Sequence, residues 1–429
     1  METIFAPINN HRNSAVCTVR ISGGNIFALQ RFIPSLPKAQ HRFARRVKIF
    51  DADDSQLDDA LLLFFKAPNS FTGEDILEVS LHASPFIVAK FLALLSSIEG
   101  FRFAKAGEFC LRAVENRKIS LDEAEAINKL ILSESAVQHR LAVKEMNGIC
   151  KDYYSTIKAD MIKILSLLET FIDFSEEEEI PQDFITSIKT LNKSLVNTLQ
   201  NTIRFSKRQE TYDVQIAILG KPNVGKSTLF NALTSTDDAI VSEIAGTTRD
   251  MLKKTLTIAG FKVELVDTAG IRNNAEQIEQ IGIERAKKLA ENADIILLLK
   301  EHINEDIYNL STTFKGEVIT VLTKTDVHGA REDAINVSYN DIAQLEERLH
   351  STLQERFQEM QSVGFLCNAR QEAILKRTLG ILQGVNFTLE PELLAENFHH
   401  ALHTISFLVG DINNEDILGE IFSSFCIGK

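Results

Sequence analysis

This 429-residue chain has few cysteines, no long apolar run and no excess of positive charge. Its five cysteines are dispersed and odd in number, which argues against a disulfide framework and fits a reducing cytosol. No stretch approaches the roughly 20 apolar residues of a membrane helix. The first ten residues resemble neither a secretory signal nor an Arg-rich presequence. We therefore expect a cytoplasmic protein without a membrane span.

The acidic balance limits the ways in which nucleic acid can bind. A net charge of −13 argues against general nucleic-acid affinity, so any RNA would need a local basic patch or a partner's surface. Two basic clusters, 42–48 and 204–208, could contact phosphates, although a solvated face is the simpler interpretation. The apolar share of 44% and the charged share of 24% are ordinary for a globular protein.

The chain alternates between mixed and helical patterns, and its length suggests about three domains. The first segment mixes short strand-like runs with a helical run. Helical periodicity follows, with apolar residues at a 3–4 spacing from Ile157 to Ile172. Strands and helices then alternate, as in a mostly parallel sheet with helices on both faces, before the helical pattern returns. This predicts an α+β domain and an α/β domain inserted into a discontinuous all-helical domain, over residues 1–118, 119–211, 212–352 and 353–429.

The most informative motif is a phosphate-binding loop, Gly220–Thr228, with the sequence Gly-Lys-Pro-Asn-Val-Gly-Lys-Ser-Thr. It follows an apolar run, Val214–Leu219, and opens a helix that is expected to begin near Ser227. Backbone N–H groups in such a strand–turn–helix unit point at anionic oxygens. Lys226 supplies positive charge to the outer phosphates, and the Ser227 hydroxyl is placed to ligate Mg²⁺. The motif predicts a nucleoside triphosphate site.

Later motifs indicate the base and the chemistry. Asp267-Thr268-Ala269-Gly270 ends a second apolar strand, where a carboxylate can reach the metal through water and a Gly N–H can meet the γ-phosphate. The switch-type loop Gly246–Asp250 lies between the two motifs, and its Thr248 can offer Mg²⁺ a second hydroxyl. A further strand ends in Thr323-Lys324-Thr325-Asp326, whose Asp326 carboxylate can accept from the N1–H and N2–H₂ of guanine, an edge that adenine lacks. The order and spacing predict GTP.

Two irregularities bear on the mechanism. Thr323 stands where the base-reading motif usually has Asn, which predicts weaker binding with unchanged base specificity. Ile271 stands where a Ras-like switch would place its water-orienting Gln. An isoleucine cannot hydrogen-bond to water, so hydrolysis must take its water-positioning group from elsewhere.

Motifs along nearly the whole chain resemble one family, the bacterial wobble-uridine tRNA-modification GTPases known as MnmE or TrmE. No other family known to us joins a GTPase to a Cys-x-Gly-Lys ending. The segments that carry the resemblance are 19–23 (Val-Arg-Ile-Ser-Gly), 68–75 (Pro-Asn-Ser-Phe-Thr-Gly-Glu-Asp), 107–109 (Gly-Glu-Phe), 122–126 (Asp-Glu-Ala-Glu-Ala), 278–285 (Ile-Glu-Gln-Ile-Gly-Ile-Glu-Arg) and 421–429 (Ile-Phe-Ser-Ser-Phe-Cys-Ile-Gly-Lys).

The resemblance implies how the missing catalytic groups are supplied. Family members use K⁺ in place of an arginine finger, with Asn223, Ser242, Ile244 and Thr247 as its matching ligands. Glu279 matches the carboxylate that orients the attacking water, although from the sequence alone a solvated glutamate at a helix start would be favoured. Lys226, Thr248 and Glu279 are the expected catalytic residues for hydrolysis. The expected GTP, Mg²⁺ and K⁺ contacts are Asn223, Val224, Gly225, Lys226, Ser227, Thr228, Ser242, Glu243, Ile244, Ala245, Gly246, Thr247, Thr248, Asp267, Thr268, Ala269, Gly270, Thr323, Lys324, Asp326 and Ser338.

The N-terminal segment resembles the family's folate-binding and dimerising domain. Arg20, Glu78, Lys118 and Lys429 match positions that hold 5-formyltetrahydrofolate or a related tetrahydrofolate, although without the family they would be taken for surface charges. Arg and Lys suit the glutamate carboxylates of folate, and Glu78 can accept from the N–H edge of a pterin. Two departures predict a reshaped pocket or weaker folate binding. His-Arg-Asn-Ser at 11–14 replaces a Gly-rich segment, and His-Ala-Ser at 82–84 replaces His-Gly-Gly.

The implied function is a homodimeric, K⁺-activated GTPase that acts with the flavoprotein MnmG on the wobble uridine of certain tRNAs. Cys426 matches the family cysteine needed for modification but not for GTP hydrolysis, and a small buried hydrophobe is the alternative. A regulatory or ribosome-assembly switch is the alternative function, which would need neither Cys426 nor the folate-type residues. A degenerate homologue is a third hypothesis, suggested by Thr323, by the segment 11–14 and by Tyr339.

Overall fold

A computed structural model describes residues 2–9, 14–174, 182–204, 213–235, 252–267, 289, 291, 293–302, 316–331, 334–338, 341–365, 367–409, 425 and 428. The chain groups into two compact units, and each is described by itself. One unit comprises 1–128, 146–151 and 406–429, and the other comprises 129–145 and 152–405. The predicted boundaries at 118, 211 and 352 stay predictions.

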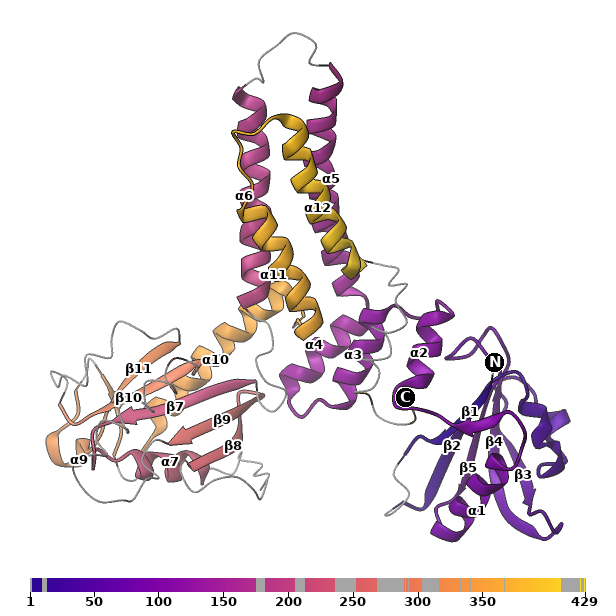
Figure 1. Cartoon of the computed structure of the whole chain (residues 1–429). Helices are drawn as coiled ribbons and strands as arrows, with labels where there is room; N and C mark the ends of the chain where they lie inside the picture. The colour runs from indigo at the N-terminus through magenta and orange to yellow at the C-terminus, as the bar shows by residue number, and fades with distance from the viewer. Residues whose placement is uncertain are drawn as a thin grey trace, which may run out of the picture. The chain divides into compact units, whose positions relative to one another are not determined.

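The first unit is built on a six-stranded sheet in the order β3-β4-β5-β2-β1-β6 (Figure 1). Alternate residues of its strands bury one face, where Val19, Leu62 and Val79 pack with Val88 and Phe91 of the helix α1. On the other face, β2 and β5 carry polar residues, among them Thr18, Arg20, Glu78 and Ser80. The strands are β1 (Thr3–Pro7), β2 (Val16–Ser22), β3 (Arg45–Phe50), β4 (Gln56–Phe65), β5 (Ile76–His82) and β6 (Phe101–Phe103), and the helices are η1 (Ile26–Arg31), η2 (Leu36–Lys38), α1 (Pro85–Ser96), α2 (Glu108–Glu115) and most of α3 (Leu121–Ile131).

The second unit contains a sheet in the order β12-β11-β10-β7-β9-β8, parallel except for β8. Both faces of β7 are buried, as expected of a central parallel strand. Ile216 and Ile218 pack with residues of α7 and α10, while Ala217 and Leu219 belong to a separate apolar cluster. The elements are β7 (Val214–Gly220), α7 (Lys226–Thr234), β8 (Leu252–Ile258), β9 (Phe261–Asp267), β10 (Ile295–Lys300), β11 (Glu317–Leu322), α9 (Thr325–His328), β12 (Ile335–Asn336) and α10 (Ala343–Val363).

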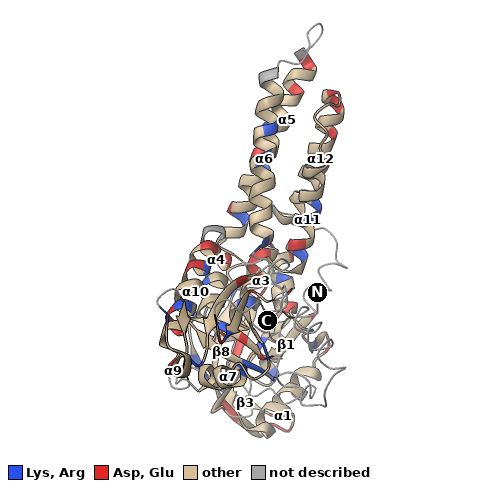
Figure 2. Cartoon of the chain, turned by 90° about the vertical axis from the view of Figure 1, so that its left-hand side faces the viewer, with Lys and Arg blue, Asp and Glu red and all other residues tan. Residues whose placement is uncertain are grey.

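Long helices that precede the sheet in the sequence pack against helices that follow it. The helical domain is therefore discontinuous in the sequence. The predicted apolar face of α5 is confirmed over most of its length: Ile157, Met161, Ile164, Leu165 and Leu168 are buried, and Phe171 and Ile172 are half-buried. Asn192 of α6 donates to the carbonyl of Leu382 of α11, so helices that precede and follow the sheet are in contact. Basic and acidic residues both occur along α5 (Figure 2). These helices are α4 (Ala136–Met146), α5 (Ile149–Phe174), α6 (Gln182–Arg204), α11 (Ala369–Gln383) and α12 (Pro391–Val409).

The helix α4 packs against the turn between β8 and β9. Val137 and Leu141 join the apolar core beneath the sheet, and the Val137 N–H donates to the Gly260 carbonyl at 3.2 Å. Gln138 also donates to Asp213 at 2.7 Å. These contacts explain why residues 129–145 group with the second unit. Among the residues that the structure describes, no helix has both the length and the apolar composition to cross a membrane.

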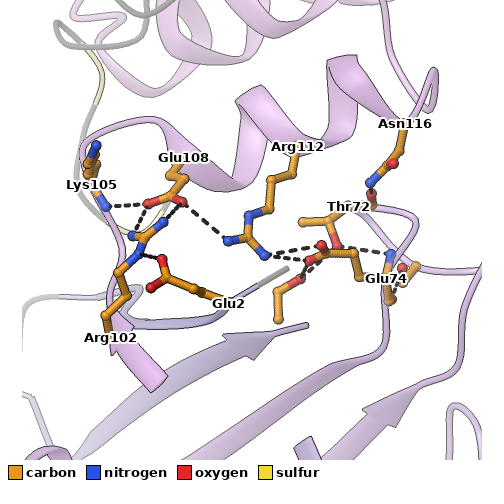
Figure 3. A network of polar contacts seen from close by, with 10 residues as sticks. Glu2, Thr72, Glu74, Arg102, Lys105, Glu108, Arg112 and Asn116 are labelled. Atoms are coloured by element: carbon orange, nitrogen blue, oxygen red, sulfur yellow. Dashed lines mark hydrogen bonds and ion pairs between the residues drawn. The ribbon is translucent and has the colours of Figure 1, made fainter. Parts of the chain in front are cut away.

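A chain of ion pairs links the α2 helix to the first sheet (Figure 3). Arg102 of β6 pairs with Glu108 at 2.6 Å, and Glu108 also contacts Arg112 one helical turn later at 3.3 Å. Arg112 in turn pairs with Glu74 at 2.9 Å, and Glu74 accepts a 2.6 Å hydrogen bond from Ser22 at the end of β2. Glu108 and Arg112 are each only 7% exposed, so the loss of either partner would leave the other buried without its counter-charge.

The network favours the ionised form of Glu108. Burial raises the pKa of this carboxyl, but the hydrogen bonds from Arg102 and from the Lys105 backbone, with both arginine charges, outweigh burial and leave the pKa below its ordinary 4.5. A lowered pKa in the folded state contributes stability at every pH above the unfolded value. That contribution is lost as the pH falls through the folded value.

We expect Glu108→Gln to destabilise the first unit by about 3 kcal/mol at neutral pH, because two arginines lose a buried partner. The difference from the wild type should begin to shrink as the pH falls below about 4.5, where the unfolded carboxyl takes up a proton, and should continue to shrink until the pH has passed the lower pKa of the folded carboxyl. Scanning calorimetry measures this, with Glu99→Gln, an exposed glutamate of the same unit, as the control. Equal midpoints for the two variants at neutral pH would contradict the assignment.

Candidate functional site

Several predicted motifs meet at one edge of the second sheet. The strands β7, β9, β10, β11 and β12 run parallel, so their carboxyl ends lie at the same edge. The register places Ile218 of β7 opposite Asp267, Leu299 of β10 opposite Gly220, and Lys300 opposite Leu322. The loops that follow these residues therefore emerge side by side, which is where parallel sheets bind ligands.

The loop after β7 has the backbone of a phosphate cradle. A side chain at Gly220 would place its Cβ 2.8 Å from the carbonyl oxygen of Leu299 and 2.9 Å from Val224, so only glycine fits between the strands. Asn223 adopts a positive φ of 64°, and Gly225 a φ of 104° at the start of α7. Successive residues with unusual φ turn backbone N–H groups toward one point, as in anion-binding nests.

Lys226 and Ser227 lie at the first turn of α7. The Lys226 ammonium donates to the carbonyls of Gly220 and Lys221 at 2.9 and 2.7 Å, which keeps its charge at the loop. Burial lowers the pKa of Lys226, and the nearby Asp267 carboxylate partly opposes this. The Ser227 hydroxyl donates to the Asp267 carboxylate at 3.2 Å, so the two predicted Mg²⁺-side groups are in contact.

These groups fit a magnesium-bound nucleotide. A hydroxyl and a carboxylate are the hard oxygen donors that Mg²⁺ prefers, and Asp267 is completely buried at the strand end. The ammonium of Lys226 and the N-terminal turn of α7 provide the positive side of the site. Ser227 would hold bound Mg²⁺, with Asp267 beside it, and the ion would offset the charge of the phosphates.

The predicted base-reading segment follows β11 at the same edge. The Thr323 hydroxyl donates to the carbonyl of Lys300 at 3.2 Å. A Cβ placed on Gly225 would lie 4.0 Å from the Thr323 Cβ, so Thr323 is next to the phosphate loop. Asp326 lies in the short helix α9 and is exposed, as a base-contacting carboxylate must be. Ser338 follows β12 and pairs through its backbone N–H with the Asp341 carbonyl at 3.0 Å. The expected loss of affinity from Thr323 stays a prediction.

Sequence reasoning missed one neighbour of this segment, Glu301. It follows β10 and pairs through its carboxylate with the Lys324 ammonium at 2.5 Å, while its other oxygen lies 3.9 Å from His328. Lys324 has φ 56° and ψ 36°, a left-handed conformation that costs a non-glycine residue on the order of 1 kcal/mol. The ion pair helps to hold Lys324 in that conformation, two residues before Asp326. The sequence feature that could have identified Glu301 is its position directly after the apolar strand β10.

A second predicted site lies on the polar face of the first sheet. Arg20 of β2 and Glu78 of β5 are directly opposite in register, and the Arg20 guanidinium donates to Glu78 at 2.8 and 3.0 Å. The rings of Phe71 and Phe109 lie 5.5 and 5.6 Å from that guanidinium. An ion pair flanked by two aromatic rings could take a flat heterocycle that offers N–H donors.

The segment that contains Phe71 also contacts Lys118. A Cβ at Gly73 would lie 3.3 Å from the Lys118 side chain, and Asn116 donates to the Thr72 carbonyl at 2.7 Å. The carboxyl-terminal residues approach the same unit. Phe425 is buried with Cys110 and Ala124, next to Phe71. A Cβ at Gly428, whose φ is 98°, would lie 2.6 Å from the Pro7 carbonyl at the end of β1.

The structure thus brings together Arg20 with Glu78, and Lys226 with Ser227 and Asp267. Val224 and Thr228 belong to the same loop and helix. The remaining predicted residues lie outside the described part of the chain: Ser242, Glu243, Ile244, Ala245, Gly246, Thr247, Thr248, Thr268, Ala269, Gly270, Glu279, Cys426 and Lys429.

A phosphate loop after a central parallel strand, with a carboxylate-bearing base segment at the same sheet edge, defines a P-loop nucleotide-binding protein. Two family models cover almost the whole chain: the GTP-binding protein TrmE N-terminus matches residues 3–118, and the MnmE helical domain matches residues 121–426. The chain belongs to the MnmE family of tRNA modification GTPases.

Full-length relatives agree with that membership. The tRNA modification GTPase MnmE of Ehrlichia chaffeensis (strain ATCC CRL-10679 / Arkansas) is 36% identical over 443 residues, with 100% of both chains covered. The same protein of Rickettsia bellii (strain OSU 85-389) is 34% identical over 449 residues, again with 100% of both covered. The G domain of the T. maritima FeoB iron transporter is 26% identical, with 34% of this chain and 97% of that chain covered and a TM-score of 0.25.

We expect Glu301→Gln to raise the KM for GTP about two- to tenfold and to leave kcat unchanged, because Lys324 loses its ion pair far from the reacting phosphate. Glu301→Asp should recover part of the loss. The control is Glu317→Gln at the opposite end of β11, which removes an exposed pair with Arg348. A fall in kcat, or equal KM values for the two glutamine variants, would show that Glu301 does not position the base segment.

Proposed function

We propose that this chain is a K⁺-activated GTPase that acts with the flavoprotein MnmG on tRNA. Together they would add an aminomethyl-type group, carboxymethylaminomethyl, at C5 of the wobble uridine, using a tetrahydrofolate one-carbon unit. Membership in the MnmE family supports the tRNA-modifying role. The observation that carries the GTPase is the contact of Ser227 with Asp267 beside Lys226, at the end of the phosphate loop.

Each residue has a defined task in hydrolysis. Lys226 neutralises charge on the outer phosphates, and Ser227 and Thr248 hold Mg²⁺. Asn223, with Ser242, Ile244 and Thr247, would hold K⁺, which offsets charge that builds on the leaving β-phosphate oxygens. Asn223 is exposed and its positive φ places it at the turn of the loop, which suits a ligand to a cation. Glu279 orients the attacking water. It takes the role of the Ras-like glutamine, because Ile271 stands at the glutamine position and cannot hydrogen-bond to water.

We expect GTP hydrolysis to be much faster in KCl than in matched NaCl, and Glu279→Ala to abolish the stimulated rate. The reason is that the cation supplies positive charge and the carboxylate orients water in the same transition state. Steady-state phosphate release by the full-length protein measures both effects. Tight GTP binding by the Glu279→Ala variant would control for misfolding.

The comparison of KCl with NaCl also distinguishes the proposed function from the alternative function. Equal, slow rates in both salts would contradict the K⁺-activated mechanism. The regulatory or ribosome-assembly switch would then be the better account. A K⁺ response without any modification of tRNA in the presence of MnmG would point instead to a degenerate homologue.

The folate site is the second part of the proposal. Glu78 would accept from the N–H edge of the pterin between the Phe71 and Phe109 rings, while Lys118 and Lys429 would meet the glutamate carboxylates. The bound folate supplies the one-carbon unit. The burial of Phe425 and the close approach of Gly428 to Pro7 support the proposal that Lys429 reaches the folate site. Homodimerisation through this domain, a cytoplasmic location and a role for Cys426 in modification belong to the same proposal.

We expect Gly428→Ala to weaken 5-formyltetrahydrofolate binding at least tenfold, because the new Cβ would collide with the Pro7 carbonyl at a positive φ and displace Lys429. Titration calorimetry measures the affinity, and K⁺-stimulated GTP hydrolysis should be unchanged. Gly24→Ala is the control, since a Cβ there meets nothing within 4 Å. Wild-type affinity in Gly428→Ala would exclude the carboxyl terminus from the site.

A further inference from the structure

The hairpin of β3 and β4 separates its charges by position. Residues 31–50 contain six basic and no acidic residues, whereas residues 51–59 around the tip contain five aspartates. Two of these aspartates form ion pairs, Asp51 with Lys90 and Asp59 with Arg46, and Asp58 hydrogen-bonds to the His82 ring. The negative charge of the tip is thus partly offset by nearby side chains.

The opposite end of the hairpin, which we call the basic end, comprises Lys38, Arg42, Phe43, Arg45 and Lys66. Among the described residues, no carboxylate forms an ion pair with any of its four basic members. In a chain of net charge −13, this concentration of unpaired positive charge is a local exception. Such a patch attracts phosphates in a way that the protein as a whole does not.

Backbone contacts hold the basic end in shape. The Arg42 N–H donates to the Phe64 carbonyl at 2.8 Å, and Arg42 has a positive φ of 58°. The Lys66 N–H donates to the His41 ring at 3.0 Å, which brings Lys66 beside the start of the loop. The Arg45 guanidinium donates to the Lys38 carbonyl at 3.0 Å. Lys38, Arg42 and Lys66 are exposed and Arg45 is half-buried, in an ordered turn at the edge of the sheet, where β3 is the outermost strand (Figure 1).

Phe43 is the apolar residue of this turn and is 59% exposed. Packing gives no reason for an aromatic ring there, because Phe43 belongs to neither the apolar core of this unit nor its rim. An exposed ring flanked by arginines is the arrangement that binds unpaired nucleotides, with the ring stacking on a base and the cations on its phosphates. Anionic lipid would be satisfied by charge alone and would not require the ring to stand among the arginines.

We propose that the basic end binds an unpaired segment of the tRNA, with one base stacked on Phe43 and the phosphates held by Arg42, Arg45 and Lys66. The inference rests on the proposed function, because it takes tRNA as the substrate. It adds the contact surface and the manner of binding. The site lies on the edge strand, apart from the Arg20–Glu78 pair on β2 and β5.

The test is the affinity of the full-length protein for a wobble-uridine tRNA transcript, measured by fluorescence anisotropy over a range of KCl concentrations. Loss of one stacked base by Phe43→Ala should weaken binding about five- to a hundredfold with little change in salt dependence. The double variant Arg42→Gln/Lys66→Gln should lower the slope of log K against log salt by roughly one and a half.

Two matched controls separate these effects from general changes. Phe86→Ala removes another exposed ring of the same unit, 69% exposed at the start of α1, and Lys163→Gln removes an exposed lysine of α5. Both should bind tRNA as the wild type does. All variants should keep K⁺-stimulated GTP hydrolysis, which shows that they are folded.

The possible outcomes distinguish a failure of this inference from a failure of the proposed function on which it rests. Wild-type binding of tRNA with equal affinities for Phe43→Ala and Phe86→Ala would overturn the inference and leave the proposed function standing. No tRNA binding by the wild type in the presence of MnmG would overturn both. If the Arg42→Gln/Lys66→Gln variant lost binding to phosphatidylglycerol vesicles but not to tRNA, the basic end would be a lipid-binding surface instead.

Discussion

The nucleotide site depends on the close approach of the phosphate loop to β10. A Cβ at position 220 would lie 2.8 Å from the Leu299 carbonyl. Only glycine therefore fits where the loop leaves β7. The approach fixes where α7 begins, and with it the positions of Lys226 and Ser227. The latter then meets Asp267 from the neighbouring strand. The site is therefore assembled by strand register before any ligand arrives.

In the first unit a network of ion pairs has a comparable organising role. Arg102, Glu108, Arg112 and Glu74 form a continuous network, buried at Glu108 and Arg112, from β6 through α2 to the end of β2. The segment that holds Glu74 also carries Phe71 beside Arg20 and Gly73 beside Lys118. The polar network thus fixes the segment on which the proposed folate contacts depend.

Much of this could be predicted from the sequence where the signal is local. The phosphate loop, the strand before it and the apolar face of α5 are each encoded within a few turns or one strand, and the structure confirms them. β6 could not be predicted, because three residues gain strand geometry only by pairing with β1 about a hundred positions earlier. Glu301 was missed for the same reason, since its partner Lys324 lies in another loop.

The discontinuous helical domain has a consequence for synthesis on the ribosome. Asn192 of α6 reaches its partner Leu382 only after a further 190 residues have been made. At about 5–20 residues per second, this takes roughly 10–40 s, and the face of α6 that α11 covers stays exposed throughout. The second sheet can complete its own core in that interval, because its strands are contiguous in the chain. α5 and α6 can already contact each other in that interval, through Tyr153 with Thr202 and Phe171 with Phe184. The helical domain therefore completes its packing only after the insert has been made, and the uncovered face of α6 is available to a chaperone until then.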